Sequence, residues 1–158
     1  MNPANPTYPQ LTPRQKAREM AFQFLYQLDQ TKGSMAIGEI EAEFKIHADH
    51  FNTAQLSRDF ALRLVKQTLS SLDAIDAVIT SHAENWRIDR IGAIEKAFLR
   101  MGAAELIYFK DVPASVTLNE VIELSKYFGE AETPAFLNGI LDPISRDPQA
   151  TEGKVLSE

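Results

Sequence analysis

The chain has 158 residues, 44% hydrophobic and 24% charged, with a formal net charge of −6 at pH 7. These values are typical of one globular domain, and they exclude a disordered chain or a protein coated with positive charge. The absence of cysteine excludes disulfide scaffolds, cysteine zinc sites and thiol catalysis. No apolar run approaches the roughly 18–20 residues of a membrane span, and the amino terminus lacks the apolar core of a secretory signal, so we expect a cytoplasmic protein.

The first predicted helix follows a flexible segment. Residues 1–12 are rich in proline and asparagine and predict an N-terminal arm without packed structure. Thr12 followed by Pro13 is typical of a helix start, because threonine caps the helix and proline fits its first turn. Apolar residues then recur at helical spacing as far as Asp29, and Gly33 is expected to end this helix.

Two further helical patterns come next. A short acidic helix, which Ser34 is placed to cap, has an apolar stripe that ends at Phe44. Residues 53–81 then form one long helical pattern. Ser70 and Ser71 mark the point at which this pattern is expected to bend.

The middle of the chain predicts two more helices. Residues 85–87 break the periodicity, and Asp89 is expected to cap a helix that runs to Phe109. After a turn at residues 111–113, another amphipathic helix is expected to run as far as Gly129.

The last predicted helix starts with Thr133 and Pro134, which repeat the cap-plus-proline signal. Pro143 removes a backbone donor and crowds the preceding turn, so it should end or kink this helix near Asp142. Residues 147–158 are expected to form a disordered tail.

The predicted fold is all-α, with six or seven helices in one domain over residues 13–146. No segment alternates for long with the period of two that a strand requires. Asn138 and Gly139 would favour a hairpin turn between strands, but their neighbours keep helical spacing.

One histidine pair is the only candidate for a metal site. His47 and His50 lie three residues apart, so on a helix both imidazoles could reach one metal ion. No third ligand stands at a recognisable spacing, which favours a plain polar helix end. The chain also lacks a glycine-rich phosphate loop and a nucleophile motif, so the sequence predicts neither an enzyme nor a bound cofactor.

Glu105 is the one carboxylate whose spacing places it near the apolar face of its helix. A buried carboxylate is costly without a partner, so we expect a structural hydrogen-bond network there instead of catalysis. The candidate partners are Arg90, Arg100 and Asn119.

The start of the first helix is basic on a chain that is acidic overall. Arg14 and Arg18 lie four residues apart and share a helix face, with Lys16 beside them. The helix dipole disfavours cations at an amino terminus, so this placement suggests either contact with nucleic acid or a solvated face. Tyr26 and Phe136 are aromatic residues that could stack on unpaired bases.

Six segments within residues 13–146 carry a family pattern in a fixed order. They are Ala17-Arg-Glu-Met-Ala-Phe-Gln-Phe-Leu-Tyr26, Trp86-Arg-Ile-Asp-Arg90, Ala97-Phe-Leu-Arg-Met-Gly-Ala-Ala-Glu-Leu106, Asp111-Val-Pro113, Asn119-Glu-Val-Ile-Glu-Leu-Ser-Lys126 and Phe136-Leu-Asn-Gly-Ile-Leu-Asp142. As a set they resemble the NusB family of bacterial transcription antitermination factors. The resemblance implies a bundle of six to seven helices in two packed helical subdomains, with no catalytic activity and no cofactor.

The resemblance also implies partners. It implies binding of the boxA element of nascent RNA together with NusE, the small-subunit ribosomal protein of the RNA polymerase antitermination complex. The implied RNA-binding residues are Arg14, Lys16, Arg18, Tyr26, His82, Glu132 and Phe136. Glu95 is the implied contact for the basic ribosomal protein. Some members of the family pair into homodimers that cover the RNA face, so a homodimer is one expected form.

Two other functions stay open at this point. Gln15 interrupts the basic run, and the net charge is −6, which together suggest a helical scaffold that binds proteins without RNA. The other alternative is a detached NusB-like module of a ribosomal RNA methyltransferase. The chain has no room for a cofactor-binding domain and no cysteine for that chemistry.

Overall fold

The computed structural model describes residues 10–31, 36–51, 54–84 and 87–151. The regular elements in these ranges are α1 Pro13–Thr31, α2 Ile37–Ala48, α3 Gln55–Ser70, α4 Leu72–His82, the 3-10 turn η1 Ile88–Arg90, α5 Ala93–Tyr108, α6 Ala114–Ser125 and α7 Thr133–Ser145. The prediction of an all-α fold with six or seven helices is confirmed. The signals expected at Gly33, Ser34 and residues 85–86 lie outside the described residues. Within the described ranges, no helix is long and apolar enough to cross a membrane.

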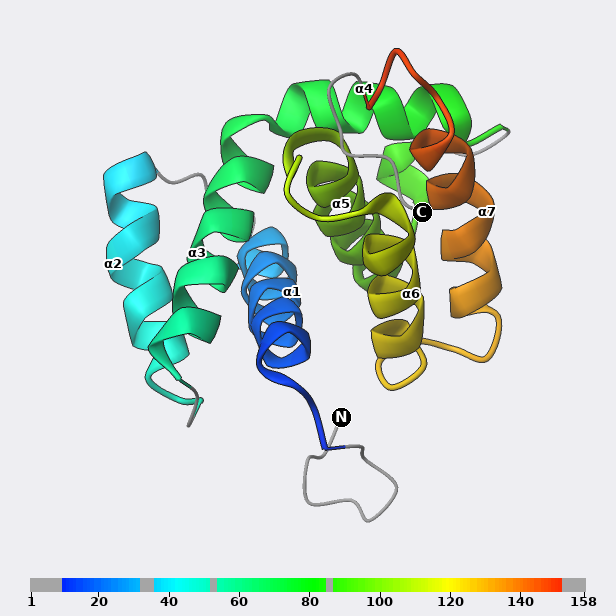
Figure 1. Cartoon of the computed structure of the whole chain (residues 1–158). Coiled ribbons are helices and arrows are strands. Elements are labelled where there is room, and N and C mark those ends of the chain that lie inside the picture. The colour runs from blue at the N-terminus through cyan, green and yellow to red at the C-terminus, as the bar shows by residue number, and fades with distance from the viewer. Residues whose placement is uncertain (1–9, 32–35, 52–53, 85–86, 152–158) are drawn as a thin grey trace.

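The helices form two packed groups, with α5 between them. Helices α1, α2 and α3 contact one another, and α4, α6 and α7 pack around α5 (Figure 1). Helix α5 is buried along nearly all of its length, as a helix with apolar residues on every side should be. Phe22 of α1 stacks on Phe98 of α5, with ring centroids 3.8 Å apart, and this contact joins the two groups.

The long helical pattern of residues 53–81 is two helices, so the expectation of one helix is wrong. The expected bend is a full break at Ser71, which has φ −118° and ψ 24°. Just before it, the hydroxyl of Thr68 donates to the backbone oxygen of Leu64 at 2.7 Å, and the side-chain Nε2 of Gln67 donates to the Ser71 hydroxyl at 2.8 Å. Side-chain hydroxyls that compete for backbone hydrogen bonds weaken and bend a helix.

Pro143 was expected to end or kink α7 near Asp142, and the helix does not end there, because it continues to Ser145. Pro143 lacks only the one donor that would reach Gly139, one turn earlier. The next turn closes normally, since the N–H of Arg146 donates to the backbone oxygen of Asp142 at 3.2 Å. A proline in the last turn therefore removes one bond without ending the helix.

Two other helix ends differ from the prediction. Asp89 does not cap α5: it lies inside η1, with its carboxylate 3.2 Å from the guanidinium of Arg87, and Gly92 precedes α5. Helix α6 ends at Ser125, four residues before Gly129, and single turns fill the interval.

The beginning of the predicted C-terminal tail is folded onto the body of the protein. The N–H of Thr151 donates to the backbone oxygen of Asp147 at 3.0 Å, and Thr151 is buried. The Asp147 carboxylate lies 2.9 Å from the His82 ring at the end of α4. Residues 147–151 therefore differ from the disordered tail that was expected to begin at 147.

Candidate nucleic-acid interface

The start of α1 is fixed in place by its own cap and by α3. The N–H of Thr12 donates to Gln15 Oε1 at 2.9 Å, and the N–H of Gln15 donates to Thr12 Oγ1 at 3.3 Å. This reciprocal pair is a capping box, and it confirms the helix start predicted at Thr12 and Pro13. The Ser57 hydroxyl on α3 donates to the backbone oxygen of Pro13 at 2.9 Å. Gln15, which interrupts the basic run, therefore has a structural role.

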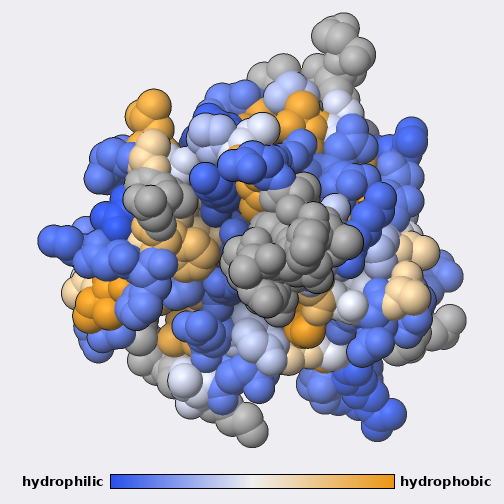
Figure 2. All heavy atoms as spheres, turned by 90° about the horizontal axis from the view of Figure 1, so that it is seen from below, coloured by the Kyte–Doolittle hydropathy of each residue, from blue (hydrophilic) through white to orange (hydrophobic). Residues whose placement is uncertain are grey.

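Arg14 is exposed and rests on an aromatic ring. Its guanidinium carbon lies 3.9 Å from the centroid of the Phe60 ring on α3. A guanidinium over a ring face keeps its charge and its outward N–H groups while its position is restricted. The side of the molecule seen from below Figure 1, where α1 begins, is mostly hydrophilic with separate small apolar patches (Figure 2). Arg14 is thus an exposed and preorganised cation.

Arg18 is not available to bind RNA directly, which corrects the sequence prediction. The residue is 1% exposed. Its Nε donates to Glu105 Oε1 at 2.9 Å and its Nη2 donates to Glu105 Oε2 at 2.7 Å. Arg14 and Arg18 do share a helix face, as their spacing predicts. This face is exposed at Arg14 and buried one turn later at Arg18. Only Arg14 of the two reaches solvent.

The Arg18 pair explains Glu105. The expected structural network is confirmed, but the partners Arg90, Arg100 and Asn119 proposed from the sequence are wrong. Glu105 is fully buried and accepts hydrogen bonds from Arg18 and from the hydroxyl of Thr117 on α6. This network ties α1, α5 and α6 together below the basic end of α1.

Lys16 and Tyr26 complete the predicted residues of α1, and both are half-buried. Tyr26 packs near Phe22, with ring centroids 6.3 Å apart. It lies twelve residues beyond Arg14, about 18 Å along the axis at ~1.5 Å per residue. The structure therefore does not bring Tyr26 next to the basic end of the helix.

His82 and Phe136 do come together, in a hollow between the end of α4 and the outer face of α7. His82 is held on both ring nitrogens: its Nε2 lies 2.9 Å from Asp147 Oδ2, and its Nδ1 lies 2.8 Å from the backbone oxygen of Val78 and 2.9 Å from the Ser81 hydroxyl. Gly139 lines the same hollow, and a Cβ added there would meet no atom within 4 Å. The hollow is thus open to a ligand above α7.

Glu95 and Glu132 both lie near the start of α7. Glu95 is half-buried, and its Oε2 accepts a hydrogen bond of 2.6 Å from the Thr133 hydroxyl. The same hydroxyl accepts a bond from the N–H of Glu130 at 2.9 Å. Glu132 is exposed and directly precedes α7. Glu95 therefore fixes the start of α7 to α5, whereas Glu132 is accessible to a ligand.

The histidine pair does not form a metal site in the described part of the chain. His47 Nε2 lies 3.1 Å from the backbone oxygen of Met20, and the His50 ring lies 3.0 Å from the backbone oxygen of Ile46. Among the residues that the structure describes, no three metal-binding side chains converge. Burial lowers the pKa of His47, which suits a neutral ring packed in the core.

Comparison with known proteins decides the family. A model of the NusB family matches residues 15–146. The chain belongs to the NusB family. A transcription antitermination protein NusB from Trichlorobacter lovleyi is 35% identical over 139 residues, covering 88% of this chain and 94% of its own. A protein of the same name from Desulfotalea psychrophila is 39% identical over 132 residues, covering 83% of this chain and 94% of its own.

Solved NusB structures share the fold. NusB of T. maritima superposes with a TM-score of 0.74 at 27% identity, covering 87% of this chain and 94% of that one. A crystal structure of the antitermination factors NusB and NusE in complex with dsRNA gives a TM-score of 0.74 at 28% identity, covering 87% and 98%. The expected NusB-like bundle of two packed helical groups is confirmed.

Sequence reasoning on this NusB-family chain missed Arg63. Its guanidinium carbon lies 3.9 Å from the centroid of the Phe109 ring, and it pairs with both oxygens of Asp111 at 2.7 and 3.1 Å. The hydrogen bond from Arg63 lowers the pKa of Asp111 to about 2. Phe109 meets Phe60 edge to face, which places this pair beside Arg14. Residues so far apart in sequence gave no local signal of this contact.

Proposed function

We propose that this NusB-family protein is a transcription antitermination factor that binds boxA RNA together with NusE and supports processive transcription of ribosomal RNA operons. The observation that carries the proposal is the family match over residues 15–146 together with the exposed cation Arg14 at an anchored helix start. The protein would act on nascent transcripts in the bacterial cytoplasm, within the RNA polymerase antitermination complex.

In this proposal residues 13–146 are the RNA-binding domain, and RNA phosphates bind Arg14 and Lys16. Phosphate contacts supply affinity, and flexible single-stranded RNA can present its bases to a second zone. That zone is the hollow of α4 and α7, where Phe136 offers a ring for stacking and His82 borders it. Tyr26 is a further stacking residue along α1.

The acidic residues have separate roles in the proposal. Glu132 stands at the edge of the α7 start, where a carboxylate can accept hydrogen bonds from base amino groups. Glu95 keeps acceptor capacity beyond its bond from Thr133, which suits a basic side chain of NusE. Arg18 takes no part in direct RNA contact, because it is buried against Glu105.

The test is binding of a labelled boxA RNA by fluorescence anisotropy, with and without NusE. The variant Arg14→Ala with Lys16→Ala should weaken binding by about tenfold for each lost cation, as charged hydrogen bonds contribute at least ~1.5 kcal/mol. The matched control is Lys45→Ala with Arg146→Ala, which also removes two cations but from α2 and from the residue after α7. Equal losses in both variants would contradict a local RNA site on α1.

One observation favours the protein-binding scaffold as second candidate. The burial of Arg18 leaves two of the three predicted cations at the start of α1 accessible. A scaffold would bind NusE with the same affinity whether or not RNA is present, at low salt where RNA contacts are strongest. A homodimer that covers the RNA face would give the same result with twice the mass in solution.

A further inference from the structure

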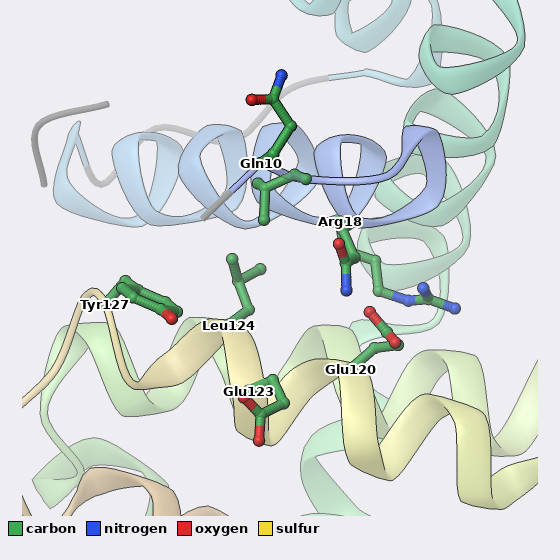
Figure 3. A pocket seen from close by; sticks show the side chains of 8 residues that line it. Gln10, Arg18, Glu120, Glu123, Leu124 and Tyr127 are labelled. Carbon is green, nitrogen blue, oxygen red and sulfur yellow. The ribbon is translucent and has the colours of Figure 1, made fainter. Parts of the chain in front are cut away.

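A cavity of about 210 Å³ lies between the start of α1 and the outer face of α6. Figure 3 shows Arg18 above it, and below it Glu120 and Leu124 on α6 and Tyr127 just after that helix. Its lining residues are Gln10, Leu11, Gln15, Arg18, Glu120, Glu123, Leu124 and Tyr127. None of them is one of the proposed RNA contacts, since Arg18 is bound to Glu105, so RNA binding by Arg14 and Lys16 does not explain the cavity.

Glu120 determines which hydrogen-bonding groups a ligand in this cavity must have. Its Oε2 is buried and, within the described part of the chain, has no hydrogen-bond partner. A buried carboxylate oxygen without a donor costs free energy, and such an atom in a native protein calls for an explanation. The side chain points from α6 toward Arg18, whose guanidinium is already bound to Glu105 (Figure 3). A ligand in the cavity would therefore have to bring donors to Glu120.

The rest of the wall restricts what that ligand can be. Glu120 and Glu123 repel a phosphate, which excludes the RNA backbone. Gln15 uses its amide oxygen in the helix cap, and in the described residues its amide nitrogen makes no hydrogen bond, so the nitrogen is a donor close to Glu120. Leu11 and Leu124 add apolar surface. The wall thus combines an amide donor, two carboxylates and apolar contacts.

We propose that this cavity binds one unpaired guanine of the RNA. The Watson–Crick edge of guanine carries an acceptor, O6, beside two parallel donors, N1–H and the N2 amine. The two donors match the carboxylate of Glu120, and O6 can accept from the amide nitrogen of Gln15. Adenine, cytosine and uracil each lack two adjacent donors on that edge. Unpaired bases are read in this way, by hydrogen bonds to the Watson–Crick edge and packing on the ring faces.

Size and position agree with a single base. Pockets for drug-sized ligands measure about 300–1,000 Å³, so about 210 Å³ suits one ring system and not a whole dinucleotide. Gln15 directly follows Arg14, the proposed phosphate contact, so the cavity adjoins the RNA path at the helix start. The inference rests on the proposed RNA binding and adds base selectivity to it.

The experiment replaces each guanine of a bound boxA RNA in turn by inosine, which lacks only the N2 amine. With the unchanged protein, one position should lose roughly 5- to 150-fold in affinity, the range of a good bidentate base contact. With Glu120→Gln that position should lose its sensitivity to inosine. Glu43→Gln is the matched control, because it removes the same charge from an exposed carboxylate on α2 that does not line the cavity, and the inosine effect should persist.

Each other outcome overturns the inference in a distinguishable way. RNA binding with no inosine effect at any guanine would overturn the guanine site and leave the proposed function intact. No RNA binding at all, with or without NusE, would overturn the proposed function and the guanine site together. Weaker NusE binding by Glu120→Gln, with unchanged inosine sensitivity, would assign the cavity to a basic side chain of that partner. A thermal melt of Glu120→Gln shows that the variant is folded.

Discussion

The fully buried pair of Arg18 and Glu105 shows how one residue can be mistaken for a surface contact. Arg18→Met would leave the Glu105 carboxylate buried without its charged partner. Breaking a buried pair in this way costs about 3–5 kcal/mol, so we expect a loss of that size in the free energy of unfolding. Urea unfolding followed by circular dichroism measures it.

A second substitution separates this structural role from RNA binding. Arg18→Met with Glu105→Gln should recover part of the loss, because the charge is gone and the new side-chain amide oxygen can still accept from Thr117. This double variant should bind boxA RNA like the unchanged protein. A folded double variant with strongly reduced RNA affinity would contradict the exclusion of Arg18 from the interface.

The pairing of Asp111 with Arg63 makes the free energy of unfolding depend on pH. Its pKa is about 2 in the folded chain, against an ordinary value of 3.8, chiefly because Arg63 donates to it. The unfolded chain binds this proton first, so the contribution is complete above about pH 4 and is lost as the pH falls toward 2. Arg63→Met should therefore lower the urea midpoint at pH 6 and show a smaller further drop at pH 3. Parallel pH profiles for both proteins would contradict the pairing.

At the scale of helices, two glycines in helix interiors should respond oppositely to alanine. A Cβ at Gly139 meets nothing within 4 Å, so Gly139→Ala should stabilise the protein by about 0.5–1 kcal/mol through helix propensity. A Cβ at Gly102 would lie 3.0 Å from Leu141 Cδ1, where α5 packs on α7, so Gly102→Ala should gain less or destabilise. Thermal and urea unfolding compare the two. Equal effects would contradict the packing difference.

The sequence predicted where helices lie better than it predicted which of their faces are buried. Helical periodicity located the helices of the described residues approximately, with α3 and α4 predicted as one pattern, and the Thr12–Pro13 signal gave the true start of α1. It could not separate the inner face of α1 from the outer one at Arg18, because that depends on the position of Glu105 in another helix. Contacts between distant segments, such as Arg63 with Phe109, leave no trace in local spacing.

At the scale of the whole molecule, the family resemblance predicted how the helices pack against one another, which periodicity alone does not give. Patterns of apolar residues say that helices are buried but not which neighbours they meet. The fold places the buried helix α5 between two helix groups and leaves the start of α1 at one side of the molecule (Figure 1). The exposed cation Arg14 therefore stands at the start of α1 on a chain whose net charge is −6.

This charge distribution predicts how RNA binding depends on salt. Two phosphate contacts, at Arg14 and Lys16, give a slope of log affinity against log salt of about −1.4 for single-stranded RNA, at ~0.7 per contact. Arg14→Ala should reduce the slope to about −0.7. Asp73→Asn, in the first turn of α4, makes the net charge one unit less negative, and α4 lies at the opposite end of the molecule from the start of α1 in Figure 1, so salt screens its effect on RNA bound there. Its slope should equal that of the unchanged protein. If Asp73→Asn altered the slope as much as Arg14→Ala, RNA would respond to total charge and no local basic site would be needed.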